Sequence, residues 1–269
     1  MVAYLILSYA GPVERLVATL RAGSPDALIA VHHDPRLRPL GAVDAERLGP
    51  WPIAWGHGSQ LAAVLRCLQA LRGRADWVVL LSGQDYPLRP VAEIEARLEG
   101  ADAFLQYAPV ARDRNDEFAR RYRHRWRPVG ERIARRAARW LPVRELPSGT
   151  YVGIPARPPL EPFHGSDWFT LSRRAVDAVL DAPREVVDHF LHTIVPTEAF
   201  VHTVLAHSGL RLVDDNRRWV QFEGRSPNPR VLGLQDLDAA FASGGDFARK
   251  FDDPLVLDEI DRRLTSAPR

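Results

Sequence analysis

Residues 77–85, Trp77-Val78-Val79-Leu80-Leu81-Ser82-Gly83-Gln84-Asp85, are the stretch from which we predict the fold of this chain. The first five are apolar throughout, which is typical of a central strand that is covered on both faces. Gly83 then permits a sharp turn, and Asp85 follows at the end of the strand. In α/β sheets ligands bind beyond the carboxyl ends of the strands. Asp85 is therefore a candidate ligand-binding residue.

The segments on either side alternate between strand and helix patterns. Residues 2–8 and 28–32 are short apolar runs typical of buried strands. A helix is expected to begin at Pro12, and another is indicated by apolar residues at 3.6-residue spacing between 61 and 71. This alternation predicts an α/β architecture, a mostly parallel sheet flanked by helices. The stretch His32-His33-Asp34 would then lie at the same sheet edge as Asp85.

Composition excludes several classes of protein. A chain of 269 residues, 46% of them hydrophobic, is long enough for one large domain. A formal net charge of +2 gives no strong case for a nucleic-acid partner. The single Cys67 excludes an intramolecular disulfide and a cysteine-cluster metal site. Met1 leads directly into an expected strand, and no apolar run approaches the roughly 18 residues of a membrane-spanning helix. We therefore expect one soluble, cytoplasmic domain over residues 1–269.

One segment of about residues 111–145 differs from the rest. Twelve arginines lie between Arg112 and Arg144, with Tyr122, Trp126 and Trp140 among them. Their roughly helical spacing predicts a solvated helical insertion. The alternative is an electropositive lip for an anionic ligand, a membrane surface or nucleic acid.

Lys250 is the only lysine among 36 basic residues, in the run Phe247-Ala248-Arg249-Lys250-Phe251-Asp252. A GC-rich genome accounts for the missing lysines and leaves open why this one remains. A compact ammonium and a planar guanidinium are not interchangeable where geometry matters, and a phosphate pocket is such a place. Fixed cations can supply the counter-charge that a diphosphate needs, and Arg230, Arg249 and Lys250 are the candidates.

A divalent metal is not expected at this edge. Asp85 offers one carboxylate, and a metal would lack its second. The only Asp-x-Asp stretch, Asp236-Leu237-Asp238, reads as a helix cap with a first-turn acid.

Glu198 stands in Pro196-Thr197-Glu198, where proline suits the first turn of a helix. A glutamate there is often only a first-turn acid that stabilises the helix dipole. A general base that deprotonates a sugar hydroxyl would occupy the same kind of position.

Four stretches, in order, resemble the motifs of one family. Residues 81–88, Leu-Ser-Gly-Gln-Asp-Tyr-Pro-Leu, resemble a signature of the core-2/I-branching glycosyltransferases, a family that includes peptide O-xylosyltransferases. Residues 165–173 look like its Gly-Ser-x-Trp block, residues 196–205 its catalytic-glutamate block, and residues 247–252 its closing motif. Weaker blocks match at residues 30–34 and at Trp55-Gly56, so the resemblance spans residues 3–252.

The resemblance implies a GT-A-like (Rossmann-like) fold and an inverting, metal-independent transfer from a UDP-sugar, with N-acetylglucosamine as the expected sugar. It implies that Glu198 is the general base and that Lys250 neutralises the diphosphate in place of a metal, with Arg230 as its partner. The remaining positions that it implies are Val31, His32 and Asp34 on the uridine side, Asp85 at the donor sugar, and Trp219 and Trp168 on the acceptor side.

Three alternatives remain open. The same site could use UDP-xylose, or the insertion could make the chain a non-catalytic module that binds a polyanion. A glycoside hydrolase with paired carboxylates is disfavoured, because only Glu198 and Asp85 stand out and the cations would have no role. The expected partners are a nucleotide-sugar donor and a carbohydrate or other hydroxyl acceptor, without nucleic acid. We expect neither the membrane anchor nor the disulfide cysteines of the animal branching enzymes, and peripheral membrane contact through the insertion stays open.

Overall fold

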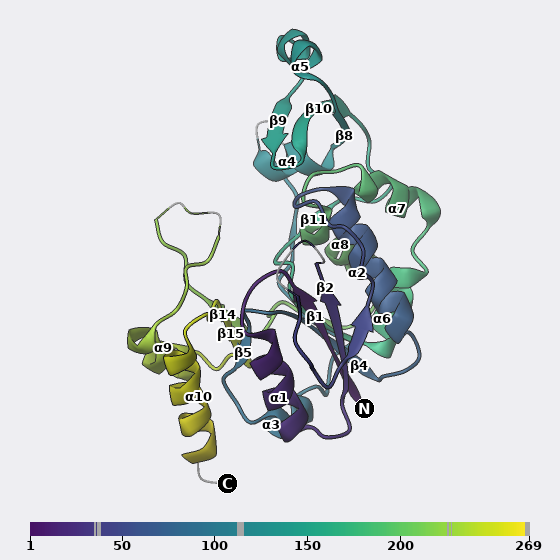
Figure 1. Cartoon of the computed structure of the whole chain (residues 1–269). Helices are drawn as coiled ribbons and strands as arrows, with labels where there is room; N and C mark the ends of the chain where they lie inside the picture. Colours follow the sequence, from purple (N-terminus) through teal and green to yellow (C-terminus); the bar gives the residue numbers. More distant parts are fainter. Residues whose placement is uncertain (35, 37–38, 112–115, 225, 227, 267–269) are drawn as a thin grey trace.

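A seven-stranded sheet lies at the centre of the structure, a computed structural model that describes residues 1–34, 36, 39–111, 116–224, 226 and 228–266 (Figure 1). In this sheet, among the described strands, only the two pairs that β12 makes, with β4 and β6, are antiparallel. The predicted mostly parallel α/β sheet is therefore confirmed. In spatial order the strands are β13 (Leu212–Val213), β6 (Ala103–Leu105), β12 (Phe169–Ser172), β4 (Trp77–Ser82), β1 (Val2–Ser8), β2 (Leu28–His33) and β3 (Glu46–Leu48).

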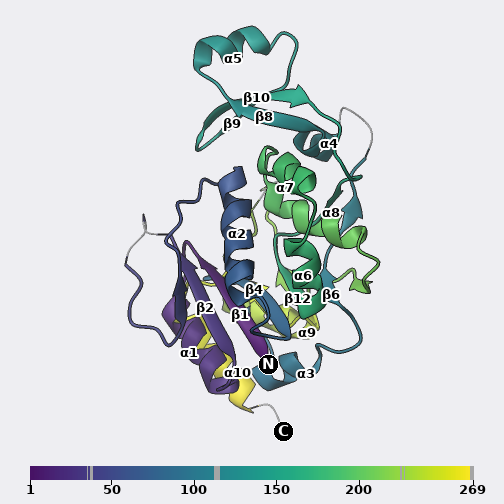
Figure 2. The ribbon, with the colours of Figure 1, turned by 90° about the vertical axis from the view of Figure 1, so that its right-hand side faces the viewer.

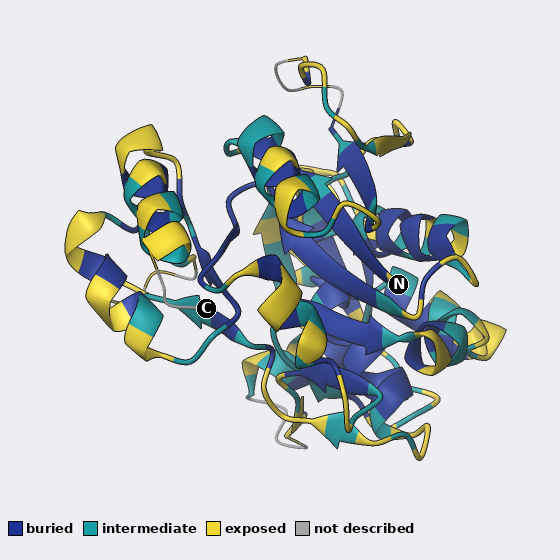
Figure 3. Cartoon of the chain, turned by 90° about the horizontal axis from the view of Figure 1, so that it is seen from below, coloured by how far each residue is buried: buried dark blue, intermediate teal, exposed yellow. Residues whose placement is uncertain are grey.

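Helices cover both faces of this sheet (Figure 2). In β1 the side chains of Ala3 and Leu5 enter one core cluster, whereas those of Tyr4 and Ile6 enter the other. The central strands are consequently buried on both sides, as Figure 3 shows. The first face is covered by α2 (Gly58–Leu71), α6 (Arg173–Leu180), α7 (Arg184–Leu191) and α8 (Phe200–Ala206), and the second by α1 (Val13–Gly23), α3 (Val91–Ala96), α9 (Leu237–Ala242) and α10 (Pro254–Ser266).

A smaller sheet joins two stretches that are far apart in the sequence. It consists of β14 (Arg218–Val220), β15 (Phe247–Arg249) and β5 (Tyr86–Pro87), in that order. Next to it, the backbone N–H of Phe251 donates to the carbonyl of Gln84 (3.0 Å), and the Gln84 amide donates to both oxygens of Asp252 (2.7 and 2.8 Å). The 81–88 motif and the 247–252 motif are thus hydrogen-bonded to one another.

Gly83 is needed for a different reason from the expected one. Its backbone lies outside the left-handed region, so a sharp turn does not require glycine here. A Cβ atom at this position would instead lie 2.2 Å from the carbonyl oxygen of Ala10. The close approach of two backbones beyond β1 and β4 therefore excludes a side chain.

The arginine-rich segment is helical only in part. It contains the helices α4 (Glu117–Tyr122) and α5 (Glu131–Ala137), and an antiparallel sheet of β8 (His124–Pro128), β10 (Gly149–Pro155) and β9 (Val143–Leu146). The segment extends to Pro155, beyond the predicted end near 145. Pro128 ends β8 and Pro142 precedes β9, so these two prolines bracket α5, and aromatic and β-branched residues on either side of it pair as strands.

We call the described residues 116–155 the insertion; Arg112 and Arg114, counted with its arginines, lie outside the described residues. The pairing of β7 (Ala108–Pro109) with β11 (Phe163–His164) joins the chain before the insertion to the chain after it. No described helix is long and apolar enough to cross a bilayer. The insertion projects away from the central sheet in both Figure 1 and Figure 2.

Candidate functional site

A cavity of about 1090 Å³ lies at the carboxyl ends of the parallel strands. Register places Ser8 opposite His33 and Leu7 opposite Ser82, so β1, β2 and β4 end at the same edge. Ser8, His32 and Asp34 line the cavity there, as predicted for a ligand edge. Its other walls come from the insertion, the 165–169 segment, the 3-10 helix η1 (Pro196–Glu198) and the smaller sheet.

Besides Asp34 at the strand ends, two carboxyl groups face this cavity from its other walls. Glu198 lies at the end of η1, and Asp167 belongs to the Gly-Ser-x-Trp block. Burial raises the pKa of Glu198 to about 7; the nearby Asp167 carboxyl also raises it, and the Arg121 guanidinium acts in the opposite direction. Burial likewise raises the pKa of Asp167, against the opposing influence of the Thr197 hydroxyl. A carboxyl group with a pKa near 7 is suited to accept a proton at neutral pH.

The backbone that presents Glu198 is held by several contacts. Val195, just before η1, has φ 49° and ψ 56°, a left-handed conformation that is strained for a β-branched residue. The N–H of Val195 donates to Gly56 O (2.9 Å), and its carbonyl accepts from the Tyr122 hydroxyl (3.2 Å). The N–H of Gly165 donates to the carbonyl of Glu198 (2.9 Å). Strained backbone held from several sides is characteristic of functional sites.

Arg121, from α4 of the insertion, contacts Glu198 directly. Its Nη1 lies 3.0 Å from Glu198 Oε2, and its Nη2 lies 2.5 Å from Glu117 Oε1. The guanidinium also lies over the Phe118 ring, 5.3 Å from its centroid. The insertion therefore supplies the counter-charge for the cavity glutamate.

Arg249 and Lys250 form a cationic wall of the cavity. Arg249 is buried, with its guanidinium 4.2 Å from the centroid of the Trp168 ring, and Nη2 donates to the Tyr9 hydroxyl (3.1 Å). Burial lowers the pKa of Lys250, and the charge of Arg249 acts in the same direction. No carboxylate in the described part of the chain forms an ion pair with Lys250. Its ammonium is therefore available to an anionic ligand.

Asp85 lies behind this wall and does not line the cavity, in contrast to its expected place at the donor sugar. Its Oδ2 accepts from the Ser82 N–H (2.6 Å) and lies 3.7 Å from Arg249 Nε. The 81–88 motif turns inward after β4, so the carboxylate is only 1% exposed. Asp85 therefore positions Arg249.

Three other predicted site residues do not line the cavity. Val31 is part of the core, and Trp219 packs half-buried against the same cluster. The Arg230 guanidinium pairs with Asp236 (Nη1–Oδ2 2.8 Å) and with Gln221. The role of Arg230 at a diphosphate stays an untested prediction.

The Asp236-Leu237-Asp238 stretch has a structural role. Asp236 accepts from the Gly233 N–H (2.8 Å) at the start of η2 (Leu234–Asp236), while Asp238 pairs with Arg263 (2.7 Å). Across the described residues, no three His, Cys, Asp or Glu side chains gather in a way that could hold a metal ion.

Sequence reasoning missed Asp167, Arg121 and Arg218. Asp167 stands at the variable position of the Gly-Ser-x-Trp block, and Arg121 is one of many similar arginines, so neither had a distinguishing signal. Arg218 is buried and lines the cavity, with Nη2 donating to Leu80 O (3.0 Å). The family resemblance implied its neighbour Trp219 instead, and nothing in the resemblance pointed to Arg218.

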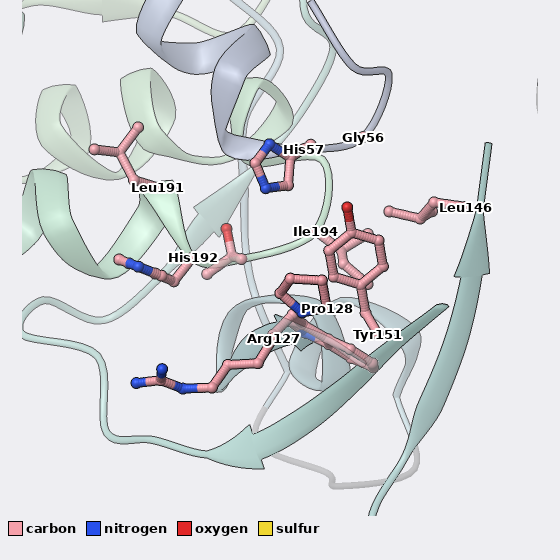
Figure 4. Close-up of a pocket in the computed structure, with 11 residues that line it drawn as sticks. Gly56, His57, Arg127, Pro128, Leu146, Tyr151, Leu191, His192 and Ile194 are labelled. Carbon is pink, nitrogen blue, oxygen red and sulfur yellow. The ribbon is translucent and has the colours of Figure 1, made fainter. Parts of the chain in front are cut away.

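A second cavity, of about 400 Å³, lies where the insertion meets the body of the protein (Figure 4). The rings of His57 and Tyr151 face one another across it, with centroids 5.9 Å apart. Three pairs of successive residues separate the two cavities, because one member of each pair lines the small cavity and the other lines the large one. The small cavity is lined by Gly56, Leu146 and Ile194, and the large cavity by their neighbours Trp55, Pro147 and Val195.

Several known proteins are similar to this chain. Xylosyltransferase 1 of Homo sapiens is 29% identical over 194 residues, which cover 64% of this chain and 18% of the relative. The xylosyltransferase of Ciona intestinalis is 28% identical over 271 residues, an alignment that covers 81% of this chain and 28% of the relative. The chain thus spans less than a third of the length of these relatives. A solved structure, the inositol-1-phosphate CTP transferase from T. maritima, has 11% identity and a TM-score of 0.36, with 99% of this chain and 97% of that chain covered.

A family model described as Core-2/I-Branching enzyme matches residues 2–243. The matched range contains the 81–88, 165–173 and 196–205 motifs and ends before Arg249 and Lys250. Since this match covers most of the chain, the chain belongs to the Core-2/I-Branching enzyme family.

Proposed function

We propose that the protein is an inverting, metal-independent glycosyltransferase of GT-A-like architecture that moves a sugar from a UDP-sugar to an acceptor hydroxyl. The observation that carries the proposal is one cavity with a carboxyl group on one wall and two cations on another: Glu198, Lys250 and Arg249. Family membership supports the reaction class.

In the proposed reaction, the Glu198 carboxylate takes the proton of the acceptor hydroxyl. The acceptor oxygen forms a bond to the anomeric carbon as the bond from that carbon to the β-phosphate oxygen breaks. The bonding pair leaves with UDP, and attack from the opposite face inverts the anomeric centre. Asp167 supports this step because a second carboxyl nearby raises the pKa of Glu198 and so strengthens it as a base.

Charge that develops on the departing diphosphate is stabilised by Lys250 and Arg249. Arg249 is held in place before any ligand arrives, by Asp85, by Tyr9 and by the face of Trp168. Groups that are fixed in this way need little reorganisation during the reaction. Arg230 can join them only by leaving Asp236.

The uridine is placed at the ends of β1 and β2, beside His32 and Asp34. His32 stacks on Trp51 with ring centroids 5.5 Å apart, and Asp34 pairs with Arg36. The motifs alone imply N-acetylglucosamine as the transferred sugar. The similar proteins are named as xylosyltransferases, and this favours UDP-xylose as the second donor to be tested.

A panel of UDP, UDP-xylose and UDP-N-acetylglucosamine, with UDP-glucose as a control, tests the proposed function by thermal shift and by slow donor hydrolysis in excess EDTA. UDP and one donor should raise the melting temperature, because a ligand bound only to the native state stabilises it by mass action. Activity should persist in EDTA. Activity that is lost in EDTA and restored by manganese would contradict the metal-free mechanism. Salt-sensitive nucleic-acid binding without any UDP effect would favour the polyanion-binding alternative.

The pH profile should depend on Arg121. Wild-type kcat/KM should rise with pH through about 7, because Glu198 acts as a base only when ionised. The positive charge of Arg121 favours the ionised form of Glu198. Arg121→Gln should therefore raise the pKa of Glu198 and shift the rising part of the pH profile of kcat/KM to higher pH by about one pH unit. The loss of activity should therefore be larger at pH 6 than at pH 9.

Arg121→Lys is the matched control because it keeps the positive charge. In this variant the rising part of the pH profile should lie near its wild-type pH. A lower rate for Arg121→Gln that is the same at every pH, with no shift of that rising part, would show that Arg121 does not act through the ionisation of Glu198.

A further inference from the structure

The outer end of the insertion combines exposed apolar and cationic side chains. In Figure 1 and Figure 2, α5 lies at the end of the insertion that is farthest from the central sheet. Ile133 is 59% exposed and Trp140 is 87% exposed. Single exposed apolar residues are ordinary on a protein surface, but this pair has arginines on the same helix beside it.

Ile133 and Trp140 lie on the same side of the helix. Past the end of α5 at Ala137 the chain continues in a turn that keeps close to the helical path, since Ala138 N–H donates to Ala134 O and Trp140 N–H donates to Ala137 O, both at 2.9 Å. Seven positions therefore correspond to about two turns, which places the two side chains one above the other. Ala134 is buried where the helix packs on β10, and the apolar pair lies on the flank of that buried side, where both side chains are open to solvent.

Three arginines form a stripe beside the apolar pair. Arg132, Arg136 and Arg139 are exposed and lie at spacings of four and three, which places them on one side of the helix. Glu131 lies 3.7 Å from Arg135, which is not part of the stripe. Among the described residues, no carboxylate pairs with any of the three arginines. The stripe is therefore an uncompensated positive surface.

We propose that this insertion tip, formed by Arg132, Ile133, Arg136, Arg139 and Trp140, docks on an anionic lipid surface. Arginines beside an anionic leaflet are attracted to its headgroups, and an exposed tryptophan and isoleucine fit the boundary between headgroups and acyl chains. A nucleic-acid duplex would satisfy the arginines and leave Ile133 and Trp140 in water, and a single strand that stacks on Trp140 would still leave Ile133 in water. The helix is far too short to span, so the tip lies in the plane of the interface.

Co-sedimentation with vesicles tests the proposal on the full chain and does not depend on the proposed function. The protein should bind vesicles of equal parts phosphatidylglycerol and phosphatidylcholine, weakly bind pure phosphatidylcholine, and lose binding as salt increases. Each basic residue near an anionic surface contributes about a fivefold factor, so the triple variant with Arg132, Arg136 and Arg139 changed to Gln should bind roughly 100-fold more weakly.

Ile133→Ser with Trp140→Ser should lower binding to anionic vesicles while leaving the net charge unchanged. Because these residues are exposed, the melting temperature should stay near that of the wild type. Matched controls remove the same kinds of groups elsewhere: Arg157, Arg184 and Arg211, all exposed, changed to Gln, and Leu255→Ser, which removes a 68% exposed leucine. The control variants should bind vesicles as the wild type does.

The proposal is overturned if the tip variants bind anionic vesicles as well as the wild type does. It is equally overturned if the control variants lose as much vesicle binding as the tip variants lose. It is also overturned if single-stranded or duplex DNA binds the tip more tightly than the vesicles and displaces them. A dimer in light scattering that the tip variants convert to a monomer, with no vesicle binding by the wild type, would overturn it as well.

Discussion

Glu198→Gln should abolish sugar transfer and leave UDP-sugar affinity near that of the wild type. The amide keeps the shape of the side chain and can accept a hydrogen bond, but it cannot take a proton at neutral pH. Loss of general-base catalysis alone should lower the rate by roughly 10²–10⁴-fold. Turnover, UDP binding and thermal unfolding measured on the same preparation separate this result from a structural effect.

Asp167→Asn is the matched control, since it removes the cavity carboxyl group that raises the pKa of Glu198. If Glu198 is the base, this variant should lower the pKa of Glu198, because one source of its upward shift is removed. A stable Glu198→Gln variant that still transfers sugar at more than about a tenth of the wild-type rate would remove Glu198 from the mechanism. A full loss of transfer in Asp167→Asn alone would then identify Asp167 as the base.

Lys250→Ala should weaken UDP-sugar binding and turnover while leaving the fold intact. One charge-assisted contact to the diphosphate contributes about 1.5–3 kcal/mol, which corresponds to about 10- to 150-fold in affinity. Lys250→Arg should also be impaired, because a planar fork replaces a compact ammonium. Titration calorimetry with UDP, in EDTA, measures the loss directly.

Arg230→Ala is the comparison variant for Lys250. Its guanidinium pairs with Asp236 in the structure, so its loss should lower the melting temperature more than it lowers UDP affinity. A large loss of UDP affinity in Arg230→Ala would show that this arginine leaves Asp236 when the diphosphate binds. Wild-type UDP affinity and turnover in Lys250→Arg would contradict the special role of the only lysine.

The sheet and its ligand edge could be predicted because they depend on backbone periodicity. The apolar runs that became β1, β2 and β4 are buried on both faces, and parallel strands bring their carboxyl ends to one edge. The link between the 81–88 and 247–252 motifs could not be predicted from periodicity. It depends on the short pairing of β5 with β15 and on the hydrogen bonds from Gln84 to Asp252.

The sequence did not predict how deeply individual side chains at this edge are buried, or which of them line the cavity. Asp85 lies at the predicted edge, yet its carboxylate turns inward to Ser82 and Arg249. Trp219 and Arg218 are neighbours on β14, and the arginine of the two lines the cavity. Adjacent residues of a strand point to opposite faces, and a resemblance between motifs does not by itself say which of two neighbours lines a cavity.

The insertion was difficult for a different reason. Its arginines resemble one another in sequence, and only the folded chain distinguishes Arg121, which contacts Glu198, from Arg132, Arg136 and Arg139 at the tip. A helical period was also expected where β8 and the start of β9 form, because charged residues on exposed strand faces carry no strong period.

The stereochemistry of sugar release distinguishes the proposed inverting transfer, with Glu198 as general base, from a retaining one. Proton NMR of the first product formed by slow hydrolysis of an α-linked UDP-sugar, with water as the acceptor, reports which face of the anomeric carbon is attacked. Attack assisted by Glu198 from the side opposite UDP predicts that the β-anomer appears first and that the α-anomer follows only by mutarotation. Initial release of the α-anomer would contradict the account.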